Sequence, residues 1–237
     1  MPTSTQSIRE IVTEHPSAAR VFNRFDIDLC SQAETSLVQA CAQLQLSVDQ
    51  VLEKLDDANR TELGSPALDP TSLSIERLIQ HIVRVHHQYV RQDLPGLAEM
   101  AHKLTAKRSD RAPELHKLEE LVEALRAEML AHIQKEEQVL FPFISQMDEN
   151  SVHECFRSVA QPVFMMVQEH ESVNRIVAEL RRLTHGFEPP EWACATHCAL
   201  FSGLRAFETN LLQHLHLEND VLFPRAVQLE SELKTRS

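Results

Sequence analysis

Two His-x-x-x-Glu pairs are the residues of this sequence best suited to chemistry. His132 with Glu136 and His214 with Glu218 repeat at an offset of 82 residues. On an α-helix, residues four apart lie one turn apart on the same face, so both side chains of a pair can reach one point. A neutral imidazole and a carboxylate are both good ligands for a divalent or trivalent cation. The spacing therefore predicts two metal-binding half-sites, one on each of two helices.

Both pairs lie within apolar helical stripes that are expected to be buried. Read in steps of four and three, the stripes are Leu118, Val122, Leu125, Met129, His132, Glu136 and Val139, and Leu200, Leu204, Phe207, Leu211, His214, Glu218 and Val221. A buried polar group without a partner costs roughly 2–7 kcal/mol, and an unpaired carboxylate costs more. Since a whole domain is stable by only about 5–15 kcal/mol, both pairs need a partner, and a metal ion would supply it.

Further ligands are expected from the helices that precede each pair. His170 lies on an apolar stripe, 44 residues before His214. The same spacing counted back from His132 reaches position 88, just beyond His86 and His87. Helical periodicity barely separates these two histidines, because each shares a stripe with apolar residues. The repeat spacing favours His87.

The predicted ligand set is therefore four histidines and two glutamates. Its members are His87, His132, Glu136, His170, His214 and Glu218. Two carboxylates can each bridge two ions, which leaves two imidazoles for each ion. Two bridged ions with nitrogen and oxygen ligands inside a helical bundle suit iron, with manganese as the weaker alternative, whereas tetrahedral zinc needs no bridge. The competing interpretation is a metal-free bundle with buried His–Glu pairs, which predicts a stable metal-free protein.

Composition favours an all-α protein and excludes some partners. The 237 residues include only four glycines and are 43% hydrophobic, and long periodic apolar stretches dominate. The formal net charge of −12 argues against nucleic-acid binding, which usually needs a basic face. No apolar run approaches the roughly 20 residues of a membrane span, and the first ten residues lack the apolar core of a secretory signal. The five cysteines form no Cys-x-x-Cys pair, so reduced thiols and a cytoplasmic location are expected.

Helical patterns divide the chain into two predicted domains. Residues 1–58 are expected to form a small helical N-terminal domain, and residues 59–72, which are rich in turn residues, a linker. The first short helix is expected to start at Ile8 and to end near Pro16, and the others are expected at residues 18–25, 36–44 and 47–55. Residues 73–237 are expected to form an up-down-up-down four-helix bundle, because short connections join antiparallel neighbours.

The four long helices of the predicted bundle are interrupted by prolines. They are expected to run over about residues 74–107, 113–147, 162–186 and 190–229. Pro95 is expected to break or kink the first of them. Pro142 and Pro224 each end a Leu-Phe-Pro sequence six residues beyond a glutamate of the pairs. They should each kink or restart their helix just past the predicted metal site.

At these residues the chain resembles the hemerythrin-like di-iron proteins. It is most similar to the bacterial family named for the repair of iron centres, which includes the ScdA, YtfE and NorA types. The carriers are Phe25 to Cys30, His81 to His87 with Leu94 and Pro95, His132 to Pro142, Glu169 and His170, and His214 to Pro224. This resemblance covers nearly the whole chain. It implies the same six ligands, favours His87 over His86, and implies a hemerythrin-like bundle with two non-haem iron ions.

The resemblance implies the repair of iron–sulfur clusters damaged by nitrosative and oxidative stress. The di-iron site would bind nitric oxide, donate iron, or both, because a fifth histidine is not evident and each iron could keep an open position. Expected partners are nitric oxide or another small diatomic, iron–sulfur proteins as repair clients and, as an open alternative, a second copy of the chain. Two other functions stay open: a nitric-oxide scavenger, and an oxygen- or redox-sensing module.

Two further residues are candidates for roles beside the metal. Family members commonly carry two adjacent cysteines in the N-terminal domain, whereas this chain has Cys30 followed by Ser31. A role that needs a single thiol is therefore assigned to Cys30, with a half-buried structural cysteine as the alternative. Glu128 lies one turn before His132 and is expected either to orient a ligand or to be a solvated helix residue.

The remaining histidines and cysteines are interpreted as structural. Surface positions are expected for His15, His102, His116, His153, His185 and His197, and His216 is expected on another helix face than its neighbouring ligands. Cys194 and Cys198, which lie one turn apart, and the single Trp192 are expected to pack near the start of the last helix.

Overall fold

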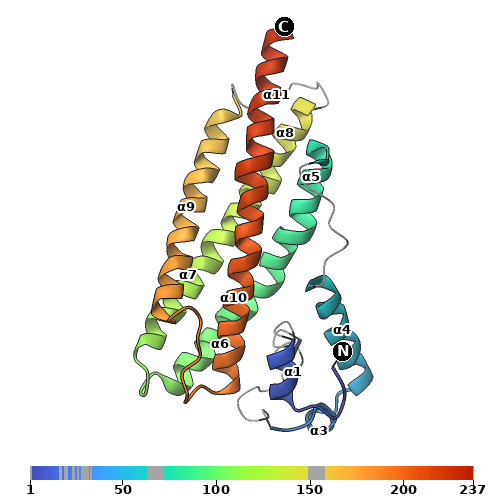
Figure 1. The fold of residues 1–237 in the computed structure, drawn as a ribbon, viewed down its shortest axis with the longest axis vertical. Coiled ribbons are helices and arrows are strands. Elements are labelled where there is room, and N and C mark those ends of the chain that lie inside the picture. The colour runs from blue at the N-terminus through green and yellow to red at the C-terminus, as the bar shows by residue number, and fades with distance from the viewer. Residues whose placement is uncertain are drawn as a thin grey trace. The chain divides into compact units, whose positions relative to one another are not determined.

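A computed structural model describes residues 2–15, 18, 21–22, 25, 27, 32, 34–62, 72–148 and 158–236. The predicted all-α class is confirmed: a small N-terminal helical region precedes a hemerythrin-like helical bundle (Figure 1). None of the helices described is long and apolar enough to cross a membrane.

Side-chain caps start the helices of the N-terminal region. Its helices are α1 (Ile8–Glu14), α3 (Leu37–Gln43) and α4 (Val48–Glu62). Ser7 accepts a hydrogen bond from the backbone N–H of Glu10, and the Glu10 carboxylate accepts one from the backbone N–H of Ser7. This reciprocal capping box satisfies two backbone donors at the start of α1. Helix α4 extends beyond the predicted residue 55. Half of the residues of the predicted helix 18–25, Cys30 and most of the predicted linker lie outside the described residues.

Four long helical stretches make up the rest of the described chain. They are α5 (Ile75–Ile82), η2 (Val83–His87) and α6 (Gln88–Arg108); α7 (Glu114–Lys135), η3 (Glu136–Leu140) and α8 (Phe141–Asp148); α9 (Ala160–Leu183); and α10 (Ala195–His216), η4 (Leu217–Leu222) and α11 (Phe223–Arg236). The predicted ends of the first two stretches agree with these bounds to within one residue. The last stretch begins five residues later than predicted and continues beyond residue 229.

The segments η2, η3 and η4 are π-helical turns, in which each hydrogen bond spans one more residue than in an α-helix. Two of them come directly before the Leu-Phe-Pro prolines, and α-helix resumes at Phe141 and Phe223. The restart predicted at Pro142 and Pro224 is therefore observed. A wider turn accommodates a proline, since the missing N–H and the ring clash both concern the preceding turn. Short π-turns in long helices are frequent at functional sites.

Pro95 and Gly186 affect their helices differently. Helix α6 continues through Pro95, so a break there is wrong, and the alternative of a kink stays a prediction. Pro95 removes one hydrogen bond from a long helix that is held by its buried neighbours Leu94 and Leu97. Gly186 adopts φ +82° and donates its N–H to the carbonyl of Arg181 at 2.7 Å, which is the C-terminal capping geometry that glycine favours.

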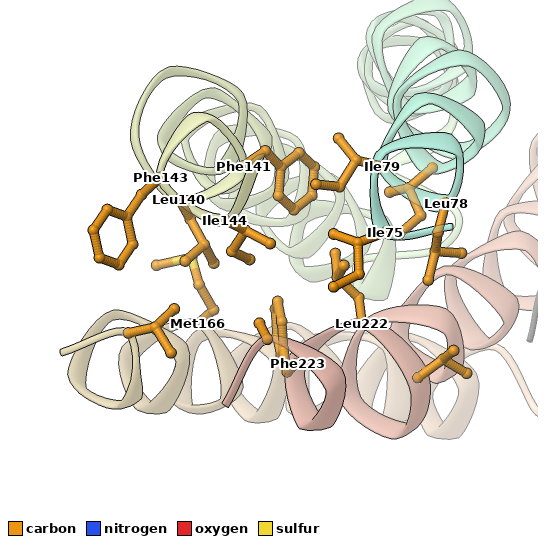
Figure 2. Close-up of a cluster of buried hydrophobic side chains, with 14 of the residues drawn as sticks. Ile75, Leu78, Ile79, Leu140, Phe141, Phe143, Ile144, Met166, Leu222 and Phe223 are labelled. Carbon is orange, nitrogen blue, oxygen red and sulfur yellow. The ribbon is translucent and has the colours of Figure 1, made fainter. Parts of the chain in front are cut away.

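An apolar cluster joins α5, α8, α9 and α11 (Figure 2). Ile75, Leu78 and Ile79 of α5 face the side chains of α8, and Phe223 lies beside them at the start of α11. Burial of a large apolar side chain contributes about 1.5–3 kcal/mol, so this cluster fixes the helices on which the His–Glu residues lie. Those residues all belong to one compact unit, formed by residues 68–94, 120–180 and 207–237.

Candidate metal centre

The structure brings the six predicted ligand residues together in two groups. One group is His87, Glu136, His214 and Glu218, and the other is His132, Glu136, His170 and Glu218. Within each group one potential ligand atom of every residue lies within 4.8 Å of the others, and all of these side chains are buried. His86 belongs to neither group. The two groups share both glutamates, as expected for a carboxylate-bridged pair of ions.

Glu218 faces one histidine of each group. Its Oε1 lies 2.8 Å from Nε2 of His214, and its Oε2 lies 3.2 Å from Nε2 of His170. Glu136 is placed in a similar way, because its Oε2 is 3.3 Å from Nε2 of His132 and 3.4 Å from Nε2 of His87. Each carboxylate is therefore within reach of both groups.

The Nε2 atoms of the four histidines also meet in pairs. Nε2 of His87 is 3.1 Å from Nε2 of His214, and Nε2 of His170 is 3.0 Å from Nε2 of His132. The rings are edge-on within each pair, with interplanar angles of 64° and 62°. Both pairs thus direct two nitrogen lone pairs toward one point, which is what a metal ion with two imidazole ligands requires.

The Leu-Phe-Pro repeats position the histidines. The ring of Phe141 stacks on His87 at 5.6 Å between centroids, and the ring of Phe223 stacks on His170 at 6.0 Å. Phe141 and Phe223 are the central residues of the two repeats, and each follows directly after a π-turn. The repeated sequence therefore serves the site in the same way on both halves: each phenylalanine covers the imidazole of another helix.

Polar atoms in the site lack hydrogen-bond partners, and a cation would satisfy them. Both carboxylate oxygens of Glu136 and Oε2 of Glu218 are buried and accept no hydrogen bond from any residue that the structure describes. A buried carboxylate without a donor is costly unless it is paired or coordinates a metal. The donor set of imidazole nitrogen and carboxylate oxygen suits iron. These residues therefore fit a di-iron centre on their own chemistry.

Without an ion, protons take the place of the positive charge. Burial opposes the charged form of His87, but the nearby carboxylates of Glu136 and Glu218 outweigh it and raise the pKa of His87 to about 10. Burial also opposes the charged form of His132, and the charge of Glu136 outweighs it and raises its pKa to about 9. The buried imidazoles in turn hold the pKa of Glu218 well below its ordinary value, against the effect of burial. Binding of a metal must therefore displace protons.

Outer partners orient three of the four imidazoles. Nδ1 of His87 lies 2.7 Å from Oε1 of Glu137, whose carboxylate also accepts two hydrogen bonds from Arg91. Nδ1 of His132 lies 3.1 Å from Oε2 of Glu169, and Lys135 donates to the other oxygen of Glu169. Such partners fix the ring orientation and raise the basicity of the ligand nitrogen.

Asn219 is the outer partner of the third imidazole, because its Oδ1 lies 2.9 Å from Nδ1 of His170. Sequence reasoning gave none of Glu137, Glu169 and Asn219 a role. A signal was present, since each of them is adjacent in the chain to one of the six residues. On a helical wheel these residues lie at the edge of the apolar stripe, where an ordinary solvent-exposed residue is also expected.

The surroundings of His214 differ. Its Nδ1 is buried and has no hydrogen-bond partner within the described part of the chain. Its ring stacks on the ring of His86, with centroids 5.5 Å apart and an interplanar angle of 6°. His86 is itself held by Asn210, whose Oδ1 lies 3.2 Å from Nδ1 of His86. The histidine that periodicity could not separate from His87 thus lies behind a different ligand candidate.

Glu128 is exposed and lines a small cavity of about 290 Å³ beside His132, together with Lys135 and Glu169. The partner of the outer nitrogen of His132 is Glu169. A direct role for Glu128 therefore stays a prediction. Cys30 lies outside the described residues, and its role also stays a prediction.

One of the histidines expected on the surface is placed elsewhere. His197 is buried, with only 2% of its surface exposed, so that expectation is wrong. It lies on the inner face of α10, three residues before the apolar stripe that begins at Leu200. His102, His116 and His185 are exposed as expected, and His153 lies outside the described residues.

Comparison with known protein families adds an independent line of support. Residues 78–226 match the model of the hemerythrin HHE cation-binding domain. Residues 4–59 match the model of the ScdA_N domain, which is described as a domain of unknown function. The first match alone covers more than half of the chain.

Three relatives match the chain over nearly its whole length. The iron–sulfur cluster repair protein YtfE of Pectobacterium carotovorum is 34% identical over 226 residues, which cover 95% of this chain and 98% of the relative. YtfE of Yersinia pseudotuberculosis is 33% identical over 225 residues, covering 95% and 98%. A probable iron–sulfur cluster repair protein of Haemophilus influenzae is 30% identical over 227 residues, covering 96% and 99%.

Proposed function

We propose that this chain, which belongs to the family of YtfE-type iron–sulfur cluster repair proteins, repairs iron–sulfur clusters damaged by nitrosative and oxidative stress. The family match and the hemerythrin HHE cation-binding domain support the proposal. So does the pair of buried His–Glu groups that share two glutamates, which is consistent with a di-iron centre. The division into an N-terminal domain of residues 1–58 and a bundle of residues 73–237 belongs to the same proposal.

We assign the ligands as follows. His87 and His214 would hold one iron, and His132 and His170 would hold the other. Glu136 and Glu218 would serve both ions. When bound, the two irons would supply redox chemistry and bind a small diatomic molecule. The observation that carries this assignment is the sharing of Glu136 and Glu218 between the groups, with buried oxygens that have no donor in the described structure.

Side chains that surround the site position its imidazoles. Glu137, Glu169 and Asn219 hold three imidazoles in the orientation that directs Nε2 inward. Phe141 and Phe223 stack on two of these rings and exclude water from them. The partners that follow from this proposal are nitric oxide and damaged iron–sulfur proteins, with a homodimer as a further arrangement to be tested.

We infer a cytoplasmic site of action for this repair. Cys41, Cys194 and Cys198 form no disulfide with any residue that the structure describes, which is consistent with a reducing compartment. Cys30 would act as a single thiol that accepts a transferred species, without an adjacent second cysteine.

The experiment that tests the proposal follows iron and repair together. Protein loaded with ⁵⁷Fe under anaerobic conditions is mixed with a [4Fe–4S] dehydratase that has been inactivated by nitric oxide. Recovery of dehydratase activity is measured beside the ⁵⁷Fe content of the repaired enzyme. We expect recovery with wild-type protein and with His216→Ala, an exposed control on α10, and little recovery with the Glu136→Ala/Glu218→Ala variant.

The outcomes separate the alternative functions. Recovery with ⁵⁷Fe in the client supports donation of iron, and recovery without ⁵⁷Fe supports removal of nitric oxide. No recovery, with stoichiometric uptake of nitric oxide, would replace repair by scavenging. Reversible binding of dioxygen without recovery would identify a sensing module instead.

A further inference from the structure

A cavity outside the His–Glu site lies among the start of α7, the end of α9 and the start of α10. Its volume is about 520 Å³, within the range of about 300–1,000 Å³ that is typical of small-molecule sites. Apolar side chains form most of its wall, namely Leu115, Leu118, Leu183, Pro190 and Phe201. All of its lining residues belong to one compact unit, and the six metal-ligand candidates belong to the other.

His197 is a buried polar group in this wall. It is 2% exposed, and neither of its ring nitrogens has a hydrogen-bond partner among the described residues. Burial lowers its pKa, with only a weak opposing effect of the Glu114 charge. The ring is therefore neutral and offers one donor and one acceptor nitrogen. A buried group of this kind destabilises the fold as long as it stays unpaired.

Aromatic rings enclose His197. The ring of Phe201 meets it edge-on, with centroids 4.4 Å apart and an interplanar angle of 87°. The ring of Trp192 is tilted at 58° to that of His197, with centroids 5.3 Å apart. Trp192 is 37% exposed and lies on the turn between Pro190 and Ala193, before α10 begins. Trp192 therefore joins the buried imidazole to the surface of the molecule.

We propose that this cavity is a second binding site, which takes an uncharged, planar, largely apolar molecule with a hydrogen-bonding group that reaches His197. Trp192 and Phe201, which both line the cavity, would supply aromatic contacts to a planar molecule. The lining includes charged residues of both signs, namely Glu114, Glu188 and Arg182. The cavity therefore favours neither a cationic nor an anionic ligand. This site goes beyond cluster repair and does not depend on it.

The single tryptophan of the chain makes the test direct. Iron-loaded full-length protein is labelled with 5-fluorotryptophan, so that one ¹⁹F resonance reports on Trp192. The probes are 2-quinolone and 1-isoquinolone, which are uncharged bicyclic lactams with one donor and one acceptor. Naphthalene is the control probe of the same shape without hydrogen-bonding groups. We expect the lactams to shift the resonance saturably.

Two variants locate the contacts. His197→Phe keeps an aromatic ring but removes both nitrogens, so it should weaken lactam binding about 10-fold and leave naphthalene binding unchanged. Its melting temperature should equal or exceed that of the wild type, because it removes an unpaired buried group. Leu183→Phe narrows the cavity and should abolish the binding of all three probes. The iron content of both variants should match that of the wild type.

Two results would overturn the proposal. One is a ¹⁹F resonance that shifts linearly or not at all up to the solubility limit of the lactams. The other is an equal dissociation constant of the lactams for wild type and His197→Phe, since this would show that the imidazole makes no hydrogen bond with the ligand. Loss of cluster repair in the Glu136→Ala/Glu218→Ala variant, with unchanged lactam binding, would show that the two sites are independent.

Discussion

His214 and His170 lie on different helices, and one carboxylate joins them: Oε1 of Glu218 is 2.8 Å from Nε2 of His214, and its Oε2 is 3.2 Å from Nε2 of His170. The two oxygens of one side chain thus serve two groups of ligands. A site that held a single ion would need only one of these oxygens. The loss of Glu218 should therefore affect both ions rather than one.

The first prediction concerns this bridge. In Glu218→Gln the side chain keeps its shape but loses its charge and one good oxygen ligand. We expect the iron content to fall from about two ions per chain to below one. Elemental analysis of anaerobically purified protein measures it. Asp220→Asn, an exposed change in the same π-turn, is the matched control and should keep the full iron content. A variant that retained one tightly bound iron would show that the carboxylate does not bridge.

The second prediction concerns the outer partners of the imidazoles. Glu137→Gln and Glu169→Gln keep a possible acceptor for Nδ1 but remove the charge that makes the ligand more basic. Loss of such a partner typically weakens metal affinity about 10–100-fold. Iron should therefore pass faster to a ferrous chelator from either variant than from the wild type, as followed by the absorbance of the chelate.

Glu128→Gln serves as the comparison for these two variants. Glu128 is exposed, whereas Glu169 contacts the outer nitrogen of His132. Iron release at the wild-type rate would identify Glu128 as a solvated residue. Release as fast as from Glu169→Gln would establish the orienting role that its position one turn before His132 suggested.

The sequence was sufficient to select the six residues that the structure brings together, because the pattern is doubled. The two His-x-x-x-Glu pairs recur at one offset within apolar stripes, and no ordinary core needs that. It was not sufficient to choose between His86 and His87 by periodicity. The reason is the π-turn η2, which contains both. A π-turn inserts one residue, so it rotates the following side chains relative to an α-helical wheel.

Contacts between helices explain what the sequence could not show. Glu169 of α9 meets His132 of α7, and their separation in the chain carries no periodic signal. His197 is a different case, since a stripe extended three residues back from Leu200 would have placed it inside. The residue type alone suggested that His197 would be exposed, but its position on the inner face of α10 determines that it is buried.

The third prediction concerns the stability of the metal-free protein against pH. His87 and His132 have pKa values of about 10 and about 9 in the folded protein, against 6.5 ordinarily. At a pH between the ordinary pKa and the raised pKa of these histidines, the folded state holds more protons than the unfolded state. The free energy of unfolding therefore falls as pH rises. The urea midpoint of metal-free protein should decrease from about pH 7 to about pH 10.

Iron-loaded protein is the control for this titration. Its imidazoles hold metal instead of protons, so the same two groups no longer contribute to the pH dependence. Loading with iron near pH 7 should release roughly two protons per chain from these imidazoles, measurable by calorimetry in buffers of different ionisation enthalpy. A flat urea midpoint for metal-free protein over this range would contradict the raised pKa values.

The fourth prediction compares two glycines whose replacement by alanine should change the stability in opposite directions, which the sequence alone does not show. Gly186 lies three residues beyond the end of α9 at Leu183 and adopts φ +82°, so Gly186→Ala should destabilise the protein by about 1 kcal/mol. Gly96 lies inside α6, and a Cβ added there meets no atom within 4 Å. Gly96→Ala should therefore stabilise the protein by about 0.5–1 kcal/mol, because alanine loses less backbone entropy in a helix. Urea unfolding of iron-loaded protein measures both. Equal effects of the two substitutions would show that the left-handed cap at Gly186 does not hold in solution.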